Sequence, residues 1–286
     1  MTISDAKPNY LIAPNPGLAN MTRVVTGTDA HGVAQSVSVV EERPLTIFLN
    51  SQEIVTAMTI GDYPEYLALG FLSNQRMLNS ADEVDAIHYD AEIQTVVVRT
   101  SQGTNFEEKL KKKTRTSGCA VGTVFGDMME GLEGLRLPHA ALRSSWLFAL
   151  AHQINTTPSL YLEAGAIHGT VLCQQDRPLV YMEDVGRHNA VDKVAGWMLQ
   201  NATSPADKIL YTTGRLTSEM VIKTANMGIP ILVSRSGFTA WGVEIAQQVG
   251  MTLIGRLRGQ RFSCLAGEER LLRDVKPRSD KAGEKR

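Results

Sequence analysis

The sequence is poor in cysteine and lacks any long apolar run. Its three cysteines, Cys119, Cys173 and Cys264, are too few and too scattered for a disulfide framework or a zinc cluster, which favours a reduced, cytoplasmic setting. Residues 1–20 lack a basic start followed by an apolar stretch, so we expect no signal peptide. No run approaches the roughly eighteen consecutive apolar residues of a membrane helix, so we expect no membrane span.

An excess of charge of one sign is also missing. The chain has 29 Lys and Arg against 30 Asp and Glu, a formal net charge of -1. No global field therefore favours nucleic acid or an anionic membrane, and any attraction to an acidic ligand must be local. With 286 residues, 43% of them hydrophobic, the chain can bury a sizeable core in one large or two modest domains.

The apolar patterns predict an α/β protein in which a small α+β domain precedes a larger α/β domain. In the larger domain, strand-like and helical stretches alternate with short links, which predicts parallel strands joined by right-handed crossovers. Asp62 and Pro64 are typical of a helix start, with Asp62 as the cap. The expected segments are a flexible arm (1–20), the α+β domain (21–110), a basic linker with a cysteine loop (111–135), the α/β domain (136–273) and a disordered tail (274–286).

Cys119 is a candidate nucleophile because it lies in a glycine-flanked loop after a run of cations. Only the thiolate is nucleophilic, and nearby positive charge stabilises it. Cys119 is therefore either reactive or an ordinary loop residue beside a solvated charged face. Cys173 and Cys264 lie in strand-like runs and are interpreted as buried small hydrophobic residues. The cations before the loop cysteine are Lys109, Lys111, Lys112, Lys113 and Arg115.

Three turns that contain glycine, hydroxyls and arginine follow predicted strands, at residues 212–219, 234–239 and 255–261. Ligands of open α/β sheets bind outside the carboxyl ends of the strands, where helix N-termini and arginines favour anions. The turns therefore predict an anion site, against the alternative of ordinary helix capping with solvated arginines. The candidate residues are Arg215, Ser218, Ser234, Arg256, Arg258, Gly259 and Arg261.

The densest polar cluster is the segment 183–189, Glu-Asp-Val-Gly-Arg-His-Asn. It could orient a ligand or set a general acid, and His188 is the candidate for contact with the ligand. It could equally form a satisfied hydrogen-bond network that fixes its own loop. His168 lies in an apolar strand, where a core histidine with satisfied hydrogen bonds is expected.

The segment EDVGRHNAVDK, residues 183–193, resembles the signature of the FdhD family of formate dehydrogenase accessory proteins. The resemblance extends through RTSGCAVG around Cys119, through GAIHGTVL and through most of the carboxy-terminal half, and only the two tails fall outside it. It implies a cytidine-deaminase-like α/β/α domain after the small α+β domain. It also implies a homodimer.

The resemblance further implies a role in the maturation of a molybdenum enzyme. Cys119 would accept sulfur from a cysteine desulfurase as a persulfide. It would pass that sulfur to the molybdenum of bis-molybdopterin guanine dinucleotide, bound as cargo and mimicked by GDP, before insertion into the catalytic subunit of formate dehydrogenase. As an enzyme, the protein would be a sulfurtransferase. His188, within the matched signature, would contact the ligand or the incoming sulfur. The cofactor-binding segment of the family matches Arg256, Leu257, Arg258, Gly259, Gln260 and Arg261.

The chain departs from the family pattern at Gly122, where a second cysteine commonly stands three residues after the first. A two-cysteine relay within the loop is therefore impossible, and a cofactor-binding chaperone without sulfur transfer is the alternative. A zinc deaminase is excluded because the chain has no Cys-x-x-Cys pair. A redox sensor at Cys119 is disfavoured because no neighbouring cysteine in the sequence could resolve it.

Overall fold

The computed structural model describes residues 9–18, 20–78, 80–101 and 132–276. A six-stranded sheet, in the order β13-β12-β11-β10-β8-β9, forms the centre of the larger part. β10, β11 and β12 are parallel, while β8 and β13 run antiparallel to them and β9 runs antiparallel to β8. The predicted α/β class and the parallel pairing are confirmed. The strands are β8 (His168–Gln174), β9 (Arg177–Asp184), β10 (Lys208–Thr212), β11 (Ile231–Ser234), β12 (Thr252–Arg258) and β13 (Arg261–Ala266).

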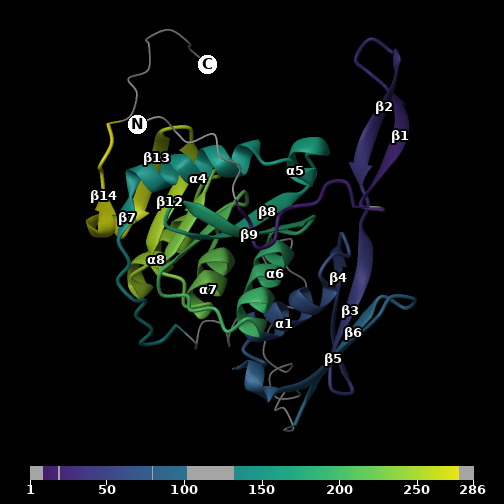
Figure 1. Ribbon diagram of the computed structural model, residues 1–286, viewed down its shortest axis with the longest axis horizontal. Helices are drawn as coiled ribbons and strands as arrows, with labels where there is room; N and C mark the ends of the chain where they lie inside the picture. Colours follow the sequence, from purple (N-terminus) through teal and green to yellow (C-terminus); the bar gives the residue numbers. More distant parts are fainter. Residues whose placement is uncertain (1–8, 19, 79, 102–131, 277–286) are drawn as a thin grey trace.

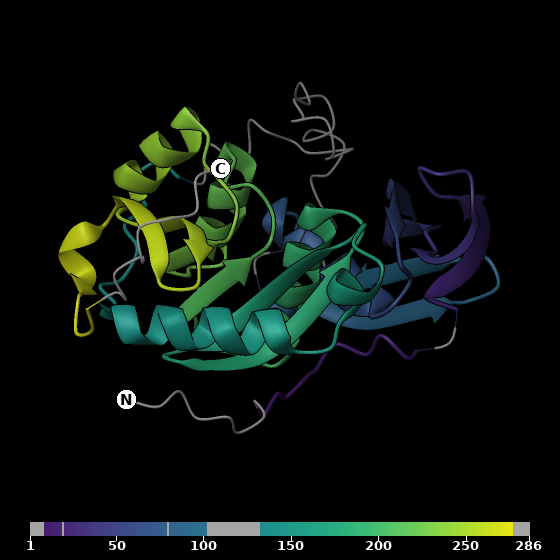
Figure 2. The same ribbon diagram turned by 90° about the horizontal axis from the view of Figure 1, so that it is seen from above.

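Helices cover both faces of this sheet (Figures 1 and 2). Because successive side chains of a strand point to opposite faces, Ile209 packs towards the helix on one face and Leu210 towards those on the other. The result is three layers, α/β/α. The expected likeness to cytidine deaminase stays a prediction. The helices are α4 (Ser144–Thr156) on one face, and α6 (Arg187–Gln200), α7 (Ser218–Asn226) and α8 (Ala240–Val249) on the other.

The amino-terminal part forms a second sheet in the order β4-β3-β6-β5, covered on one face by α1 (Pro64–Asn74). Its strands are β3 (Arg43–Leu49), β4 (Gln52–Thr59), β5 (Val84–Asp90) and β6 (Thr95–Thr100). A separate hairpin of β1 (Thr22–Thr28) and β2 (Ala34–Val40) projects from this part (Figure 1). The remaining short elements are η1 (Ala81–Glu83), α5 (Leu160–Glu163), η2 (Glu268–Arg270), and β7 (Leu142–Arg143) paired with β14 (Leu271–Leu272).

The amino-terminal arm departs from the expected flexible segment. Ile12 bridges Val180 of β9, and Leu11 N–H donates to the carbonyl of Leu179 at 2.8 Å. β9 is the last strand of its sheet, and an edge strand presents unpaired backbone groups that another segment can satisfy. For this reason the described part of the arm is held against β9. The arm's own residues have no periodicity that would predict this contact.

Two other expected boundaries also move. Leu132 and Leu135, expected in the linker, pack into the core beneath α6, α7 and α8. Asp274, expected in the disordered tail, accepts hydrogen bonds from the hydroxyl of Ser145 at 2.7 Å and from the N–H of Ser145 and the hydroxyl of Ser144, each at 3.0 Å. These bonds lower the pKa of Asp274 to about 2. Asp274 thereby supplies acceptors to the first turn of α4, whose donors have no partner within the helix.

Asp62 does not cap α1, contrary to the expectation from sequence. Tyr63 occupies the cap position in a left-handed conformation, and Pro64 is the first helical residue, as predicted. Asp62 instead pairs with Lys193 of α6. Within the described ranges, every helix is too short or too polar to cross a membrane.

Two glycines bring α1 and α6 into direct backbone contact. A Cβ atom at Gly70 would lie 1.7 Å from the carbonyl oxygen of Asp192, and one at Gly196 would lie 1.9 Å from that of Tyr66. No real side chain fits at those distances, so the crossing requires glycine on both helices. The crossing joins the amino-terminal sheet layer to the helices of the six-stranded sheet (Figure 1).

We predict that Gly70→Ala and Gly196→Ala strongly destabilise the fold, because the added methyl group meets backbone that cannot move independently. The free energy of unfolding, measured by urea titration, should fall by about 3 kcal/mol or more. Gly27→Ala is the matched control, since nothing lies within 4 Å of a Cβ built there, and its change should stay within about 0.5 kcal/mol. Equal urea midpoints for the three variants would contradict the role of the crossing.

Candidate functional site

The carboxyl ends of β9, β10, β11 and β12 lie at one edge of the six-stranded sheet, because these four strands run in the same direction. Hydrogen bonds join the loops that follow them. Leu216 N–H donates to the carbonyl of Gly237 at 2.9 Å, and Arg256 N–H donates to that of Ser236 at 2.7 Å. The three predicted turns therefore lie side by side, as the strand order predicts. That they bind an anion stays a prediction.

Ser234 uses its hydroxyl to hold the first two turns together. The buried hydroxyl donates to the carbonyl of Gly214 at 2.6 Å and accepts from Ser236 N–H at 2.9 Å. Gly214 itself allows a close approach, because a Cβ atom there would lie 3.0 Å from Cβ of Arg187 on α6. The structure thus places Ser234 as a support of the turns and brings the start of α6 against them.

The third turn is the hairpin between β12 and β13. Arg258 pairs with Arg261 across it, and Gly259 in the tight turn has a positive φ of 56°. Leu257 points away into the core on the α4 side and is fully buried, so a ligand could contact only its backbone. The exposed arginines along this sheet edge are Arg215, Arg256, Arg258 and Arg261.

The two helices that start at this edge differ in their capping. Thr239 caps α8 by accepting from Gly242 N–H at 3.2 Å, as the capping alternative expects. Thr217 precedes Ser218 at the start of α7 and makes no such bond. Its hydroxyl oxygen is buried and has no hydrogen-bond partner among the residues that the structure describes. Ordinary helix capping therefore accounts for the threonine at the start of α8. It does not account for the start of α7, where the uncapped donors could bind a ligand.

The two acids of the segment 183–189 lie at the end of strand β9, and their carboxylates accept hydrogen bonds inside the protein. Glu183 accepts from the N–H groups of Leu160 and Tyr161 at 3.0 and 2.8 Å, and burial raises its pKa. Asp184 accepts from Gly186 N–H at 3.0 Å and from the Asn189 amide at 2.9 Å. For these two acids, the hydrogen-bond network that fixes the loop is the correct interpretation.

Lys193 of α6 completes this network. Its ammonium is fully buried, pairs with Asp184 at 2.5 Å and with Asp62, and donates to the carbonyl of Glu183 at 2.9 Å. Burial alone lowers the pKa of Lys193, but the Asp184 and Asp62 carboxylates outweigh burial and raise that pKa above its ordinary value. The charge is therefore kept in the interior by two acids from distant parts of the chain.

The two histidines of this region lie differently from each other. His188 is buried, and its Nε2 is 3.2 Å from Oε2 of Glu219 on α7. His168 is not deep in the core as expected, because it begins β8 at the edge of the site and is only half-buried. Burial, and then the nearby Arg187, His188 and Arg215, lower the pKa of His168. Burial likewise lowers the pKa of His188.

The cysteines divide into a predicted nucleophile and two packed residues. Cys119, with Gly122 and the cations before it, lies outside the described residues. Cys173 is fully buried, as predicted, and burial raises its pKa. Cys264 is only half-buried, and burial raises its pKa as well. In the described part of the chain, no group of three or more His, Cys, Asp or Glu side chains is arranged to hold a metal ion.

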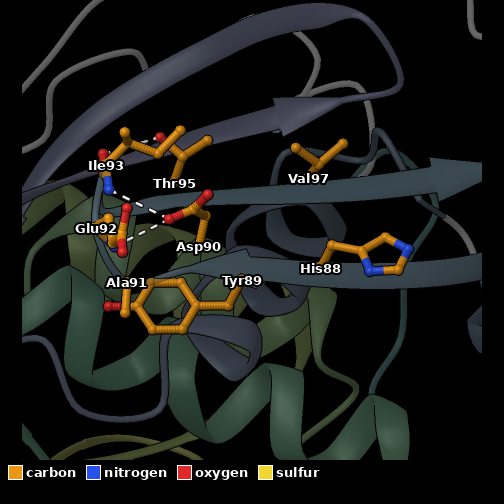
Figure 3. Close-up of a pocket in the computed structure, with 8 residues that line it drawn as sticks. All are labelled: His88, Tyr89, Asp90, Ala91, Glu92, Ile93, Thr95 and Val97. Atoms are coloured by element: carbon orange, nitrogen blue, oxygen red, sulfur yellow. Dashed lines mark hydrogen bonds between the residues drawn. The ribbon is translucent and has the colours of Figure 1, made fainter.

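A hollow of about 580 Å³ lies away from this site, on the hairpin between β5 and β6 (Figure 3). Asp90 is one of the residues that line it, and Oδ1 of Asp90 accepts from the N–H groups of Glu92 and Ile93 at 2.9 and 3.3 Å. The Asp90 carboxylate therefore stabilises the turn between β5 and β6. None of the predicted site residues lines the hollow, so we place the candidate site at the sheet edge instead.

Sequence reasoning missed Glu219 and Lys193 as partners within the site. Glu219 lies in the first turn of a helix, where an acid is ordinary, so the sequence carries no signal of its contact with His188. Lys193 lies on a helix whose other buried residues are mostly apolar, and its acidic partners come from other segments. Both contacts depend on which elements pack together.

Comparison with known proteins gives one consistent result. The model of the FdhD/NarQ family matches residues 40–272. A sulfur carrier protein FdhD from Listeria monocytogenes is 30% identical over 242 residues, covering 82% of this chain and 91% of that protein. The sulfur carrier protein FdhD of Bacillus subtilis is 28% identical over 235 residues, covering 81% and 89%. A crystal structure of a formate dehydrogenase accessory protein from Desulfotalea psychrophila superposes with a TM-score of 0.71 at 28% identity, covering 88% of this chain and 98% of that one.

We predict that Lys193→Met destabilises the protein far more than the loss of an exposed ion pair does. It leaves Asp62 and Asp184 buried without their counter-charge, so the free energy of unfolding should fall by about 3–5 kcal/mol. Arg273→Met, which removes the exposed pair with Glu268, should cost about 1 kcal/mol or less. Chemical denaturation measures both values, and similar losses would show that the buried network is not required.

Proposed function

The chain belongs to the FdhD/NarQ family, and from this premise we propose that it is an accessory protein and sulfur carrier in the maturation of a formate dehydrogenase. Its partners would be the catalytic subunit of that enzyme and a cysteine desulfurase. We further propose that it acts in the cytoplasm as a homodimer. The observation that carries the proposal is the convergence of three glycine- and arginine-containing turns at one sheet edge.

The proposed cargo is bis-molybdopterin guanine dinucleotide, whose diphosphates are anionic. Four exposed guanidinium groups along this edge (Arg215, Arg256, Arg258, Arg261) offer paired, charge-assisted hydrogen bonds to phosphate oxygens. The start of α7, where Thr217 leaves the backbone donors uncapped, adds the positive end of a helix dipole. These groups create a local positive field in a chain of net charge -1, which suits a polyanionic ligand.

The proposed sulfur step takes place on Cys119. Its thiolate attacks the outer sulfur of a persulfide on the desulfurase, the sulfur–sulfur bond of the donor breaks, and the donor leaves as a thiolate. The basic run before the loop favours this step, because positive charge stabilises the attacking thiolate. With glycine at 122, no disulfide can form within the loop, so the persulfide would persist until the cargo receives the sulfur.

Gly122 also supports a second candidate function, that of a cofactor-binding chaperone without sulfur transfer. In that case the arginine edge would still bind the cargo and Cys119 would be dispensable. The two functions differ only in the fate of Cys119, so one cysteine variant separates them.

We predict that Arg258→Ala and Arg261→Ala each weaken the binding of GDP by about 1.5–3 kcal/mol, through loss of a charge-assisted contact. The melting temperature should hardly change, because both side chains are exposed beside a hairpin turn. Arg177→Ala is the matched control, an exposed arginine at the start of β9 and hence at the opposite edge of the sheet. Isothermal titration calorimetry gives the affinities, and unchanged GDP binding in both test variants would remove this site from the proposal.

We predict a single additional sulfur on Cys119 after the protein is incubated with a cysteine desulfurase and cysteine. Mass spectrometry should detect it, and a reductant should remove it. Cys119→Ala should lose both the added mass and the activity of the client enzyme, whereas Cys264→Ala should keep both, since that side chain is half-buried. In Gly122→Cys, the added thiolate should attack the inner sulfur of the Cys119 persulfide, form a disulfide with Cys119 and release hydrosulfide, which shortens the lifetime of the persulfide. Fully active formate dehydrogenase matured with Cys119→Ala would establish the chaperone function instead.

A further inference from the structure

A buried histidine–glutamate pair lies behind the arginine edge. His188 belongs to the first turn of α6 and Glu219 to the first turn of α7. Their side chains are only 4% and 3% exposed, and Nε2 of His188 is 3.2 Å from Oε2 of Glu219. The pair belongs to the same neighbourhood as the predicted anion site, because Arg187, the residue before His188, packs against Gly214 in the first of the three turns, where a Cβ atom would lie 3.0 Å from Cβ of Arg187.

The carboxylate of Glu219 determines which ring nitrogen of His188 carries the hydrogen. A neutral imidazole has one N–H donor and one acceptor nitrogen. The nitrogen that faces a carboxylate keeps its hydrogen, so the hydrogen belongs on Nε2, which lies 3.2 Å from the Glu219 carboxylate, and Nδ1 retains its lone pair. Burial, together with the positive charges of Lys223 and Arg187, keeps the ring neutral by lowering the pKa of His188.

Both ring nitrogens of His188 are buried and make no hydrogen bond to the described residues. The Glu219 carboxylate lies 3.2 Å from Nε2, whereas Nδ1 has no such carboxylate neighbour in the described part of the chain. The hydroxyl of Thr217, two residues before Glu219, is a further buried polar atom without a hydrogen-bond partner among the described residues. Buried polar atoms of folded proteins are nearly always paired, so an unpaired acceptor and an unpaired hydroxyl, on residues either side of the His188–Glu219 contact, indicate a ligand group that matches them. The edge of a guanine base is such a group, since it carries N–H donors beside a carbonyl acceptor.

We propose that Glu219 is a positioning residue for guanine recognition. It holds His188 as the Nε2–H tautomer, so that Nδ1 accepts a hydrogen bond from a guanine N–H of the bound nucleotide. The arginines bind the diphosphate, and His188 and Thr217 form hydrogen bonds with the guanine base. The inference rests on the proposed function, because it assumes that a guanine nucleotide binds at this edge.

The test combines nitrogen-15 NMR of the histidine rings in the full-length protein with binding of GDP and ADP. In the wild-type protein, Nδ1 of His188 should give the signal of an unprotonated nitrogen and should shift when GDP binds. Glu219→Leu should lower GDP affinity about tenfold, the loss expected for one hydrogen bond, and should leave the weaker ADP affinity unchanged because adenine lacks the ring N–H. Glu219→Gln should keep GDP affinity close to that of the wild type, since its amide oxygen can still accept from Nε2–H.

Glu244→Leu, the same substitution on the exposed surface of α8, is the matched control and should change neither affinity. A hydrogen on Nδ1 in the wild-type protein would overturn the inference, and that measurement requires no variant to fold. An equal loss of GDP and ADP affinity in Glu219→Leu, or no loss at all, would also overturn it. If the wild-type protein binds neither nucleotide, the cofactor proposal fails, while a change of tautomer between wild type and Glu219→Leu still decides whether Glu219 positions His188.

Discussion

The buried ammonium of Lys193 is the charge around which the two parts of this protein are assembled. Its partners come from the segment before α1, which supplies Asp62, and from the end of β9, which supplies Asp184. An unpaired charge in the interior is costly, so α6 can occupy its place only when both acids are also in place. The close crossing of α1 and α6 at Gly70 and Gly196 follows, because it brings the two parts near enough for these contacts.

The same ion pairs support the candidate site. Asp184 orders the turn that leads from β9 into α6 by accepting from Gly186 and Asn189. That turn places His188 against Glu219 and brings Arg187 against Gly214 of the neighbouring loop. The acids of the segment are thus used for structure. The polar groups available to a ligand come from the next residues along the chain.

Acidic and basic side chains near this sheet edge differ in their exposure to solvent. Carboxylates behind it are buried and paired, whereas the arginines along it are exposed. A chain with almost balanced charge can therefore present a positive surface to an anion at one place. The two halves of the proposed function depend on different regions, since cargo binding uses this edge and sulfur transfer uses Cys119. Each half can consequently fail without the other.

The sequence by itself determined the elements whose signals are local. Strands β10, β11 and β12 and helices α7 and α8 follow from apolar runs with glycine at the helix ends, and their alternation is enough to place three turns at one edge. Cys173 was also predictable as buried, since an apolar strand surrounds it. The FdhD resemblance rests on short motifs, and these are visible in the sequence without any fold.

Only the tertiary structure decided which side chains face one another. Asp62 has the sequence context of a helix cap and pairs with Lys193 instead, and Asp274 looks like part of a tail and serves the start of α4. The sequence predicts a core position for His168, but its pKa is lowered in part by nearby cations. Glu219 has the sequence context of an ordinary acid in a first helical turn, but it contacts His188. In each case the partner is more than thirty residues away or belongs to another element. Local propensity carries no information about such pairs, because packing between elements, and not the chain neighbours, sets the burial and the charge that each group experiences.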